Sequence, residues 1–196
     1  EEGPKWHKDK QGTPTMGGLI ILFSVVITSL FFVKESNKII PVLFVTLGFG
    51  LIGFLDDYIK IIMKRSMGLS PVQKLSLQII VTSVFGYYLI NSSTVGTKML
   101  IPFTGGIENG RYVELGILFI PFFFFSLIGT VNGANFTDGL DGLVTGVTII
   151  IGVFFTVVSY MTGSGIEIVT GAVVGSLLGF LLFNVYPASV FMGDTG

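Results

Sequence analysis

The stretch IIPVLFVTLGFGLIGFLDD, residues 39–57, decides the fold of this chain. Residues 39–55 carry no charge, and two adjacent aspartates, Asp56 and Asp57, follow them directly. A helix can cross the hydrocarbon core of a membrane when roughly 17–25 consecutive residues are predominantly apolar. The backbone there must be helical, because lipid offers no partner for free N–H and C=O groups. The stretch therefore predicts a membrane-spanning helix that ends in a pair of carboxylates.

Five further stretches resemble residues 39–55 in length and apolar character. We therefore predict an all-α fold, a polytopic transmembrane helical bundle with about six spans in this chain. The predicted spans are residues 17–33, 39–55, 75–90, 115–131, 143–162 and 166–186.

The composition supports this class. Hydrophobic residues make up 51% of the 196 residues, charged residues make up 12%, and the mean hydropathy is +0.83. A soluble domain usually carries about 25% charged residues. The net charge of −1 argues against a nucleic-acid partner, and the absence of cysteine excludes disulfides and thiolate metal sites. We predict one integral membrane domain over residues 1–196, truncated at both ends, because the chain starts at Glu1 and stops just after a polar turn.

The predicted spans divide the connecting segments between two sides of the membrane. Segments near 1–16, 56–74, 132–142 and 187–196 share one side, and those near 34–38, 91–114 and 163–167 share the other. The first side holds seven of the eleven basic residues, which are Lys5, Lys8, Lys10, Lys60, Lys64, Arg65 and Lys74. The positive-inside rule therefore places that side in the cytoplasm.

All six aspartates also fall on the predicted cytoplasmic side. They are Asp9, Asp56, Asp57, Asp138, Asp141 and Asp194. The positive-inside rule concerns lysine and arginine and gives carboxylates no preference, so it does not explain this asymmetry. We infer that a chemical demand gathers the aspartates there.

The pair Asp56-Asp57 is the first candidate site. Adjacent carboxylates repel one another unless a cation lies beside them, and Mg²⁺ suits oxygen ligands and bridges carboxylates to phosphate. If the helix continues, Lys60 lies one turn after Asp56 on the same face. The alternative is a simple polar end to a span with an i,i+4 salt bridge.

The second candidate is the run NGANFTDGLDGL, residues 132–143. Its polar groups Asn132, Asn135, Asp138 and Asp141 recur at every third residue. Three residues turn a helix by about 300°, so these side chains would spread around a regular helix. We therefore expect a tight or broken helical segment at the membrane edge, in which glycines permit sharp turns. The alternative is an ordinary turn between spans.

Two weaker motifs lie near the ends of the chain. Residues 184–196 contain Asn184, an Asp194 flanked by Gly193 and Thr195-Gly196, and Phe191, which could stack on a planar ring or anchor the chain at the interface. Residues 10–18, KQGTPTMGG, place Lys10 and threonine hydroxyls at a helix start, which suits a phosphate or a polar substrate. The alternative for this second motif is a helix cap with a close-packing glycine pair.

Together the four motifs make the chain resemble the phospho-N-acetylmuramoyl-pentapeptide transferase family of bacterial cell-wall synthesis. This family is a branch of the polyprenyl-phosphate N-acetylhexosamine-phosphate transferases. The resemblance rests on residues 12–18, on Asp56-Asp57 with Lys60, on residues 132–143 and on residues 191–194. It covers essentially the whole chain.

The resemblance implies a reaction and a setting. Members transfer phospho-MurNAc-pentapeptide from UDP-MurNAc-pentapeptide to undecaprenyl phosphate, and they release UMP and form lipid I. The resemblance further implies Mg²⁺ as cofactor, ten spans in the complete protein, a homodimer, and a location in the lipid of the bacterial inner membrane with the active site facing the cytoplasm. Charge neutralisation by Mg²⁺ and lysine suits this chemistry, since both substrates are anions.

The resemblance also assigns residues. Catalysis and Mg²⁺ binding would fall to Asp56, Asp57 and Asp194. Phe191 would stack on uracil. Our preferred role for Asp56 is to remove a proton from the lipid phosphate; a two-step route with an aspartate nucleophile is also conceivable, and the sequence does not decide between them. The substrate-binding set would be Lys10, Thr15, Lys60, Asn132, Asn135, Asp138, Asp141, Asn184 and Phe191.

One feature of the family is absent from this sequence. Its histidine-rich cytoplasmic loop is not found, since the only histidine is His7. Two other functions compete with the predicted one. A sister transferase would use UDP-GlcNAc, and a cation-coupled membrane transporter would also place carboxylates in a membrane protein. Transport usually needs carboxylates near the middle of the bilayer, whereas the aspartates here are predicted at one interface.

Overall fold

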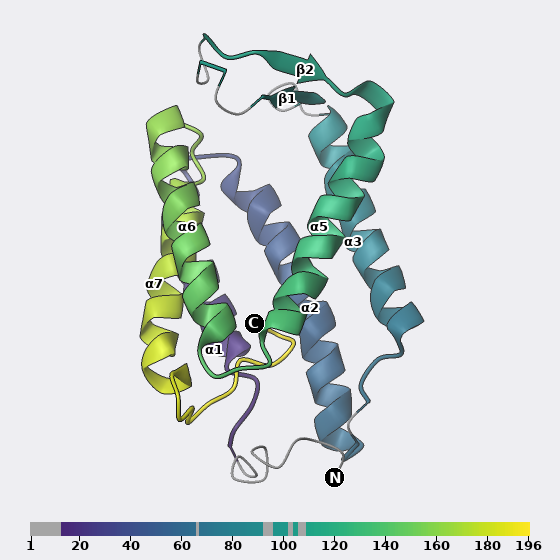
Figure 1. Ribbon diagram of the computed structural model, residues 1–196, viewed down its shortest axis with the longest axis vertical. Helices are drawn as coiled ribbons and strands as arrows, with labels where there is room; N and C mark the ends of the chain where they lie inside the picture. Colours follow the sequence, from purple (N-terminus) through teal and green to yellow (C-terminus); the bar gives the residue numbers. More distant parts are fainter. Residues whose placement is uncertain (1–12, 66, 92–95, 102–103, 106–108) are drawn as a thin grey trace.

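The computed structural model describes residues 13–65, 67–91, 96–101, 104–105 and 109–196. This part of the chain is dominated by long helices (Figure 1), and its strands form one short antiparallel hairpin. The α-helices are α1 (Gly18–Phe31), α2 (Ile39–Ile62), α3 (Pro71–Asn91), α5 (Phe119–Thr137), α6 (Leu143–Thr162) and α7 (Glu167–Asn184). The hairpin pairs β1 (Lys98–Leu100) with β2 (Tyr112–Glu114), and the 3₁₀ turn η2 (Gly116–Leu118) leads into α5.

All six predicted spans form helices, and four of the helices are long and apolar enough to cross a membrane. These four are Ile39–Ile62, Gly116–Thr137, Leu143–Thr162 and Glu167–Asn184. Helix α1 is apolar but only 14 residues long. Helix α3 has the length, at 21 residues, but is less apolar. The predicted class, a helical membrane bundle, is confirmed.

The helices pack in two groups, α1 with α6 and α7, and α2 with α3 and α5, and the groups meet where α1 contacts α2. Helix α7 lies against α6 and α1, while α3 lies against α2 and α5 (Figure 1). A buried apolar cluster between α1, α2, α6 and α7 includes Val25, Ile39 and Phe180. Many other large apolar side chains are exposed, with Phe125 81% and Phe136 89% accessible. Apolar side chains on the outside are expected where a bundle faces lipid tails instead of water.

Two predicted boundaries are wrong because helices run further than expected. Helix α2 continues to Ile62, so Asp56, Asp57 and Lys60 lie on its last turns and not in a loop. Helix α5 continues to Thr137, beyond the predicted end of the span at residue 131, and the break expected within residues 132–143 begins at Asp138. A polar residue can remain in a helix when its side chain is hydrogen-bonded. The Asn132 side chain donates hydrogen bonds to the side chain of Gln78 on α3 and to the carbonyl of Ile128.

The predicted sorting of segments into two sides agrees with the structure. The end of α2, the turn between α5 and α6, and the segment after α7 lie at one end of the bundle (Figure 1). The β1–β2 hairpin lies at the opposite end. The three groups of aspartates in the described residues are therefore brought to one end.

Candidate active site

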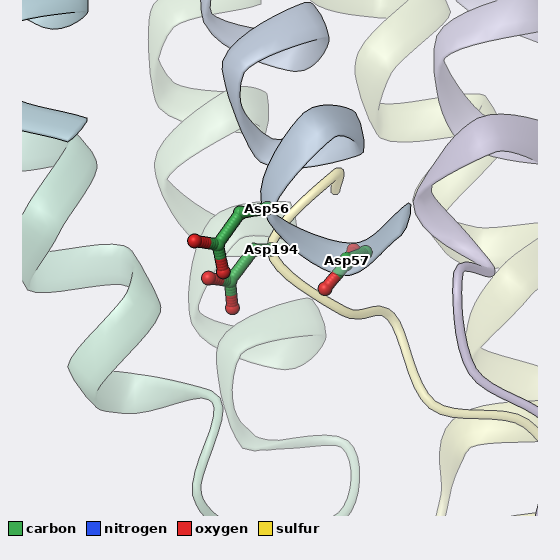
Figure 2. A group of neighbouring side chains, drawn as sticks. All are labelled: Asp56, Asp57 and Asp194. Carbon is green, nitrogen blue, oxygen red and sulfur yellow. The ribbon is translucent and has the colours of Figure 1, made fainter. Parts of the chain in front are cut away.

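Three carboxylates converge where α2 meets the segment after α7. Asp56 and Asp57 are buried on the last turns of α2, and Asp194 lies half-buried in the segment after α7 (Figure 2). One carboxylate oxygen from each residue lies within 4.8 Å of the others. Among the described residues, this is the group of acidic side chains arranged to share a metal ion.

Two lysines neutralise part of this negative charge. Lys60 Nζ lies 2.5 Å from Asp56 Oδ2, 3.1 Å from Asp194 Oδ2 and 3.9 Å from Asp57 Oδ1. The i,i+4 salt bridge of Asp56 with Lys60, which belonged to the alternative interpretation of this motif, is present, but it is part of a larger cluster with Asp57 and Asp194. Lys74, in the first turn of α3, lies 2.7 Å from Asp194 Oδ2.

Lys74 is a site residue that the sequence did not identify. It was counted only among the basic residues of the predicted cytoplasmic side. A lysine at the start of a helix that begins on the side of the aspartates could have drawn attention to it. Its pairing with Asp194, which is 120 residues away, depends on how α3 packs against α2.

The adjacent carboxylates of α2 bind different segments. Asp56 Oδ1 accepts a hydrogen bond of 2.7 Å from the backbone N–H of Leu69, in the connection between α2 and α3. Asp57 Oδ2 accepts two hydrogen bonds from Thr195, 3.0 Å from the backbone N–H and 2.7 Å from Oγ1. Each carboxylate is thus held in place by a segment outside its own helix.

Glycines allow the backbone to approach the carboxylates closely. A Cβ on Gly53 would lie 1.8 Å from the carbonyl oxygen of Asp194, and a Cβ on Gly193 would lie 2.7 Å from Asp57 Oδ2. Gly193 also has a φ of +76°, which residues with a side chain rarely adopt. At Gly193 the Asp57 carboxylate and the Thr15 hydroxyl lie where a side chain would otherwise project.

The first and last motifs of the chain pair with each other. The N–H of Phe191 donates to the carbonyl of Pro14 over 2.8 Å. The N–H groups of Gly17 and Gly18 donate to the carbonyls of Phe191 and Met192, each over 2.9 Å. This pairing holds the start of α1 beside the segment that carries Asp194.

The other predicted residues near this pairing differ in exposure. Thr15 is exposed, and its Oγ1 lies 3.2 Å from the position that a Cβ on Gly193 would take. Phe191 is half-buried. Lys10 lies outside the described residues.

The second motif contributes a carboxylate to the same neighbourhood. Asp138, directly after α5, is half-buried, and burial raises its pKa to about 6, with the charges of Asp194, Asp57 and Asp141 adding to the rise. Asn135 is half-buried on the last turn of α5. Burial is thus the main cause of the raised pKa of Asp138, and the negative charges of the other aspartates at this end of the bundle add to it.

The pKa of Asp194 moves in the opposite direction. Burial alone would raise it, but hydrogen bonds with Asp56 and Lys74 and the positive charges of Lys74 and Lys60 outweigh burial. The pKa falls to about 2. Asp194 is therefore ionised over the whole physiological range, as a ligand for a cation must be.

Two predicted substrate-binding residues make structural contacts. Asp141 Oδ2 accepts a hydrogen bond of 3.1 Å from the N–H of Ala188. The buried Asn184 side chain accepts a hydrogen bond of 2.7 Å from Thr145 Oγ1 and donates one of 3.0 Å to the carbonyl of Val190. Both residues thus hold the segment after α7, and their contact with substrate remains a prediction.

Asn132 forms an amide pair with Gln78. Asn132 Nδ2 donates a hydrogen bond of 2.9 Å to Gln78 Oε1, and Gln78 Nε2 lies 3.4 Å from Asn132 Oδ1. Both residues line a cavity of about 500 Å³, together with Asp56, Lys60 and Lys74. The cavity thus lies between Asp56 of α2 and residues of α3 and α5, and its two lysines suit a phosphorylated ligand.

The raised pKa of Asp138 predicts a pH-dependent effect on stability. Because its pKa is higher in the folded than in the unfolded state, the fold loses stability as the pH rises from about 4 through about 6. Asp138→Asn should therefore stabilise metal-free, full-length protein at pH 8 by about 1 kcal/mol, after allowance for partial exposure, and by less at pH 5. Thermal unfolding in EDTA measures this.

The control is Glu35→Gln, which removes an exposed carboxylate from the loop between α1 and α2, at the other end of the bundle. An equal gain from both substitutions, or the same gain from Asp138→Asn at both pH values, would contradict the prediction.

The fold and the cluster define an integral membrane protein in which aspartates and lysines from separate segments meet at one end of a helical bundle. The chain belongs to glycosyl transferase family 4, whose model matches residues 39–196. Residues 10–22 also match signature 1 of the phospho-N-acetylmuramoyl-pentapeptide-transferases. The family resemblance read from the motifs is thereby confirmed.

Curated relatives carry the name phospho-N-acetylmuramoyl-pentapeptide-transferase. The chain is 48% identical over 199 residues to that of Acetivibrio thermocellus, 46% over 198 residues to that of Clostridioides difficile, and 45% over 201 residues to that of Bacillus subtilis. Each alignment covers 100% of this chain. The chain spans 58% of the length of the first relative and 60% of the other two.

Proposed function

We propose that the protein transfers phospho-MurNAc-pentapeptide from UDP-MurNAc-pentapeptide to undecaprenyl phosphate, giving lipid I and UMP. The observation that carries this proposal is the cluster of Asp56, Asp57 and Asp194 with Lys60 and Lys74. The signature over residues 10–22 and the names of the curated relatives support the choice of sugar nucleotide.

The proposed reaction moves one phosphoryl centre between two anions. An oxygen of the lipid phosphate forms a bond to the phosphorus that carries the sugar, and the bond from that phosphorus to the bridging oxygen of the diphosphate breaks. UMP leaves with the bridging oxygen. Because both reactants are negatively charged, the site must offset repulsion and stabilise the charge that develops on the leaving phosphate.

The lysines and Asp56 supply this chemistry. Lys60 and Lys74 lie at the edge of the 500 Å³ cavity, where their ammonium groups can pair with phosphate oxygens. Asp56 lines the same cavity and can accept the proton that remains on the lipid phosphate. We favour this direct attack over an aspartyl intermediate, with Asp56 held beside the cavity by Leu69 and Lys60.

The residues fit a Mg²⁺ ion. Mg²⁺ prefers oxygen ligands and is usually held by one or two carboxylates together with substrate phosphates. The three aspartates offer such oxygens within 4.8 Å of one another, and the ammonium of Lys60 lies among them as a cation would. When bound, Mg²⁺ would neutralise diphosphate charge, and Asp194 with Asp56 and Asp57 would hold it.

Setting and assembly are part of the proposal. We place the protein in the bacterial inner membrane with the cluster facing the cytoplasm, which the basic residues at that end support through the positive-inside rule. We further propose a homodimer, on the family resemblance alone.

Product formation tests the proposal. Full-length protein is incubated in detergent with undecaprenyl phosphate, Mg²⁺ and radiolabelled UDP-MurNAc-pentapeptide or UDP-GlcNAc, and labelled lipid and UMP are measured. We expect both products from the first nucleotide and neither from the second. A preference for UDP-GlcNAc would indicate the sister transferase. Cation flux into liposomes, without product from either nucleotide, would indicate a transporter.

A further inference from the structure

We propose that Thr195 is a positioning residue that orients the Asp57 carboxylate and thereby holds the loop that carries Asp194. The contact itself is independent of any activity. Its consequence for metal binding rests on the proposed function, because only a shared cation makes the mutual placement of Asp57 and Asp194 matter.

The hydrogen bonds of Thr195 determine which oxygen of Asp57 is available. Both of its donors, the backbone N–H at 3.0 Å and Oγ1 at 2.7 Å, reach Asp57 Oδ2. Asp57 Oδ1 is the oxygen that lies 3.9 Å from Lys60 Nζ and so faces the cluster. A carboxylate held in this way presents one oxygen to a cation in a defined direction.

Burial makes this contact rigid. Thr195 is 2% exposed and Asp57 is 5% exposed. The lysine contacts to Asp194 differ, since Lys60 and Lys74 are long, flexible side chains that remain partly accessible. Hydrogen bonds between short buried side chains restrict motion more than contacts of flexible lysines do.

The neighbouring backbone transmits the position of Thr195 to Asp194. The N–H of Gly196 lies 3.3 Å from the carbonyl of Gly193, which closes a turn around Asp194 and Thr195. The carbonyl of Asp194 rests against Gly53 of α2, where no side chain could be accommodated. Anchoring Thr195 to Asp57 therefore anchors Asp194 beside α2.

Three variants of full-length protein test the proposal. Thr195→Val removes the hydroxyl while keeping a similar shape, Thr195→Ser keeps the hydroxyl, and Thr82→Val is the matched control. Thr82 is fully buried on α3, and its Oγ1 donates a hydrogen bond of 2.7 Å to the carbonyl of Gln78 in the same helix. The control substitution therefore also removes a buried hydrogen bond of a threonine. Binding of Mn²⁺ alone, without substrate, is measured by electron paramagnetic resonance beside thermal unfolding in EDTA.

We expect Thr195→Val to weaken Mn²⁺ binding by about 10-fold, the scale for losing a group that orients a metal ligand, and Thr195→Ser to restore it to within about 2-fold. Thr82→Val should lower the unfolding temperature and leave Mn²⁺ affinity unchanged. If Thr195→Val does not fold, Thr195→Ala tests the same loss of the hydroxyl with a smaller side chain.

Two outcomes would overturn the proposal. One is wild-type Mn²⁺ affinity in Thr195→Val while Asp194→Asn abolishes binding, which would leave the metal site and the proposed function intact. The other is equal weakening by Thr195→Val and Thr82→Val. Unchanged binding in Asp194→Asn would instead remove the metal site itself, and with it both the positioning role and the Mg²⁺ part of the proposed function.

Discussion

Asp194→Asn in the full-length protein is expected to lower Mg²⁺-dependent UMP release by at least about 10³-fold, the upper range for losing one electrostatic group at a reaction centre. Asn has the shape of Asp but no charge, so Lys60 and Lys74 lose the carboxylate oxygen that they share. The same change removes a proposed metal ligand whose low pKa of about 2 keeps it ionised. The measurement is initial rates over a range of Mg²⁺ concentrations.

Two controls give this result its meaning. Glu35→Gln removes one exposed negative charge from the α1–α2 loop and should retain wild-type rates. Thermal unfolding of Asp194→Asn should show folded protein, so that lost turnover reflects the site and not the fold. Turnover within a few-fold of wild type at saturating Mg²⁺ would exclude Asp194 from the reaction centre.

Gly53→Ala is expected to have the second large effect, through geometry and not through charge. The added methyl group would lie 1.8 Å from the carbonyl oxygen of Asp194, and this neighbour is backbone, which cannot rotate away. The segment that carries Asp194 must shift from α2. We expect a loss of about 1–3 kcal/mol in stability and about 10²-fold in UMP release, because a displacement of about 1 Å at a reaction centre costs that much.

Gly129→Ala is the matched control for this prediction. Gly129 lies within α5, and a Cβ there meets nothing within 4 Å. Alanine favours helix over glycine by about 1 kcal/mol, so this variant should be as stable as wild type or more so, with unchanged turnover. If Gly53→Ala behaved in the same way, the close approach of α2 and the Asp194 segment would be refuted.

Several features of the fold could be predicted from the sequence because they depend on local composition. Apolar runs such as residues 39–55 must form helices in lipid, whatever surrounds them. The alternation of spans then sorts the loops by parity, which brings the aspartates to one end. The pairing of Asp56 with Lys60 also follows from the helix, since four residues make about one turn.

The helix ends and the membership of the site could not be predicted in the same way. Asn132, just past the predicted end of its span, lies inside α5 and pairs with Gln78, a partner 54 residues away on α3. Lys74 becomes a site residue only because α3 packs where its ammonium reaches Asp194. The sequence contains no signal for such distances, because they arise from packing between helices.

The amino-acid sequence by itself determined that this protein is a helical membrane protein with carboxylates at one end, since hydrophobicity and helix periodicity act over neighbouring residues. Only the tertiary structure decided which carboxylates meet. Asp194 lies beside Asp56 because Gly53 has no side chain to keep the segment after α7 away from α2. Asp57 accepts a hydrogen bond from Thr195. Contacts between residues 138 positions apart depend on the shapes of packed surfaces, and those shapes exist only after the helices have assembled.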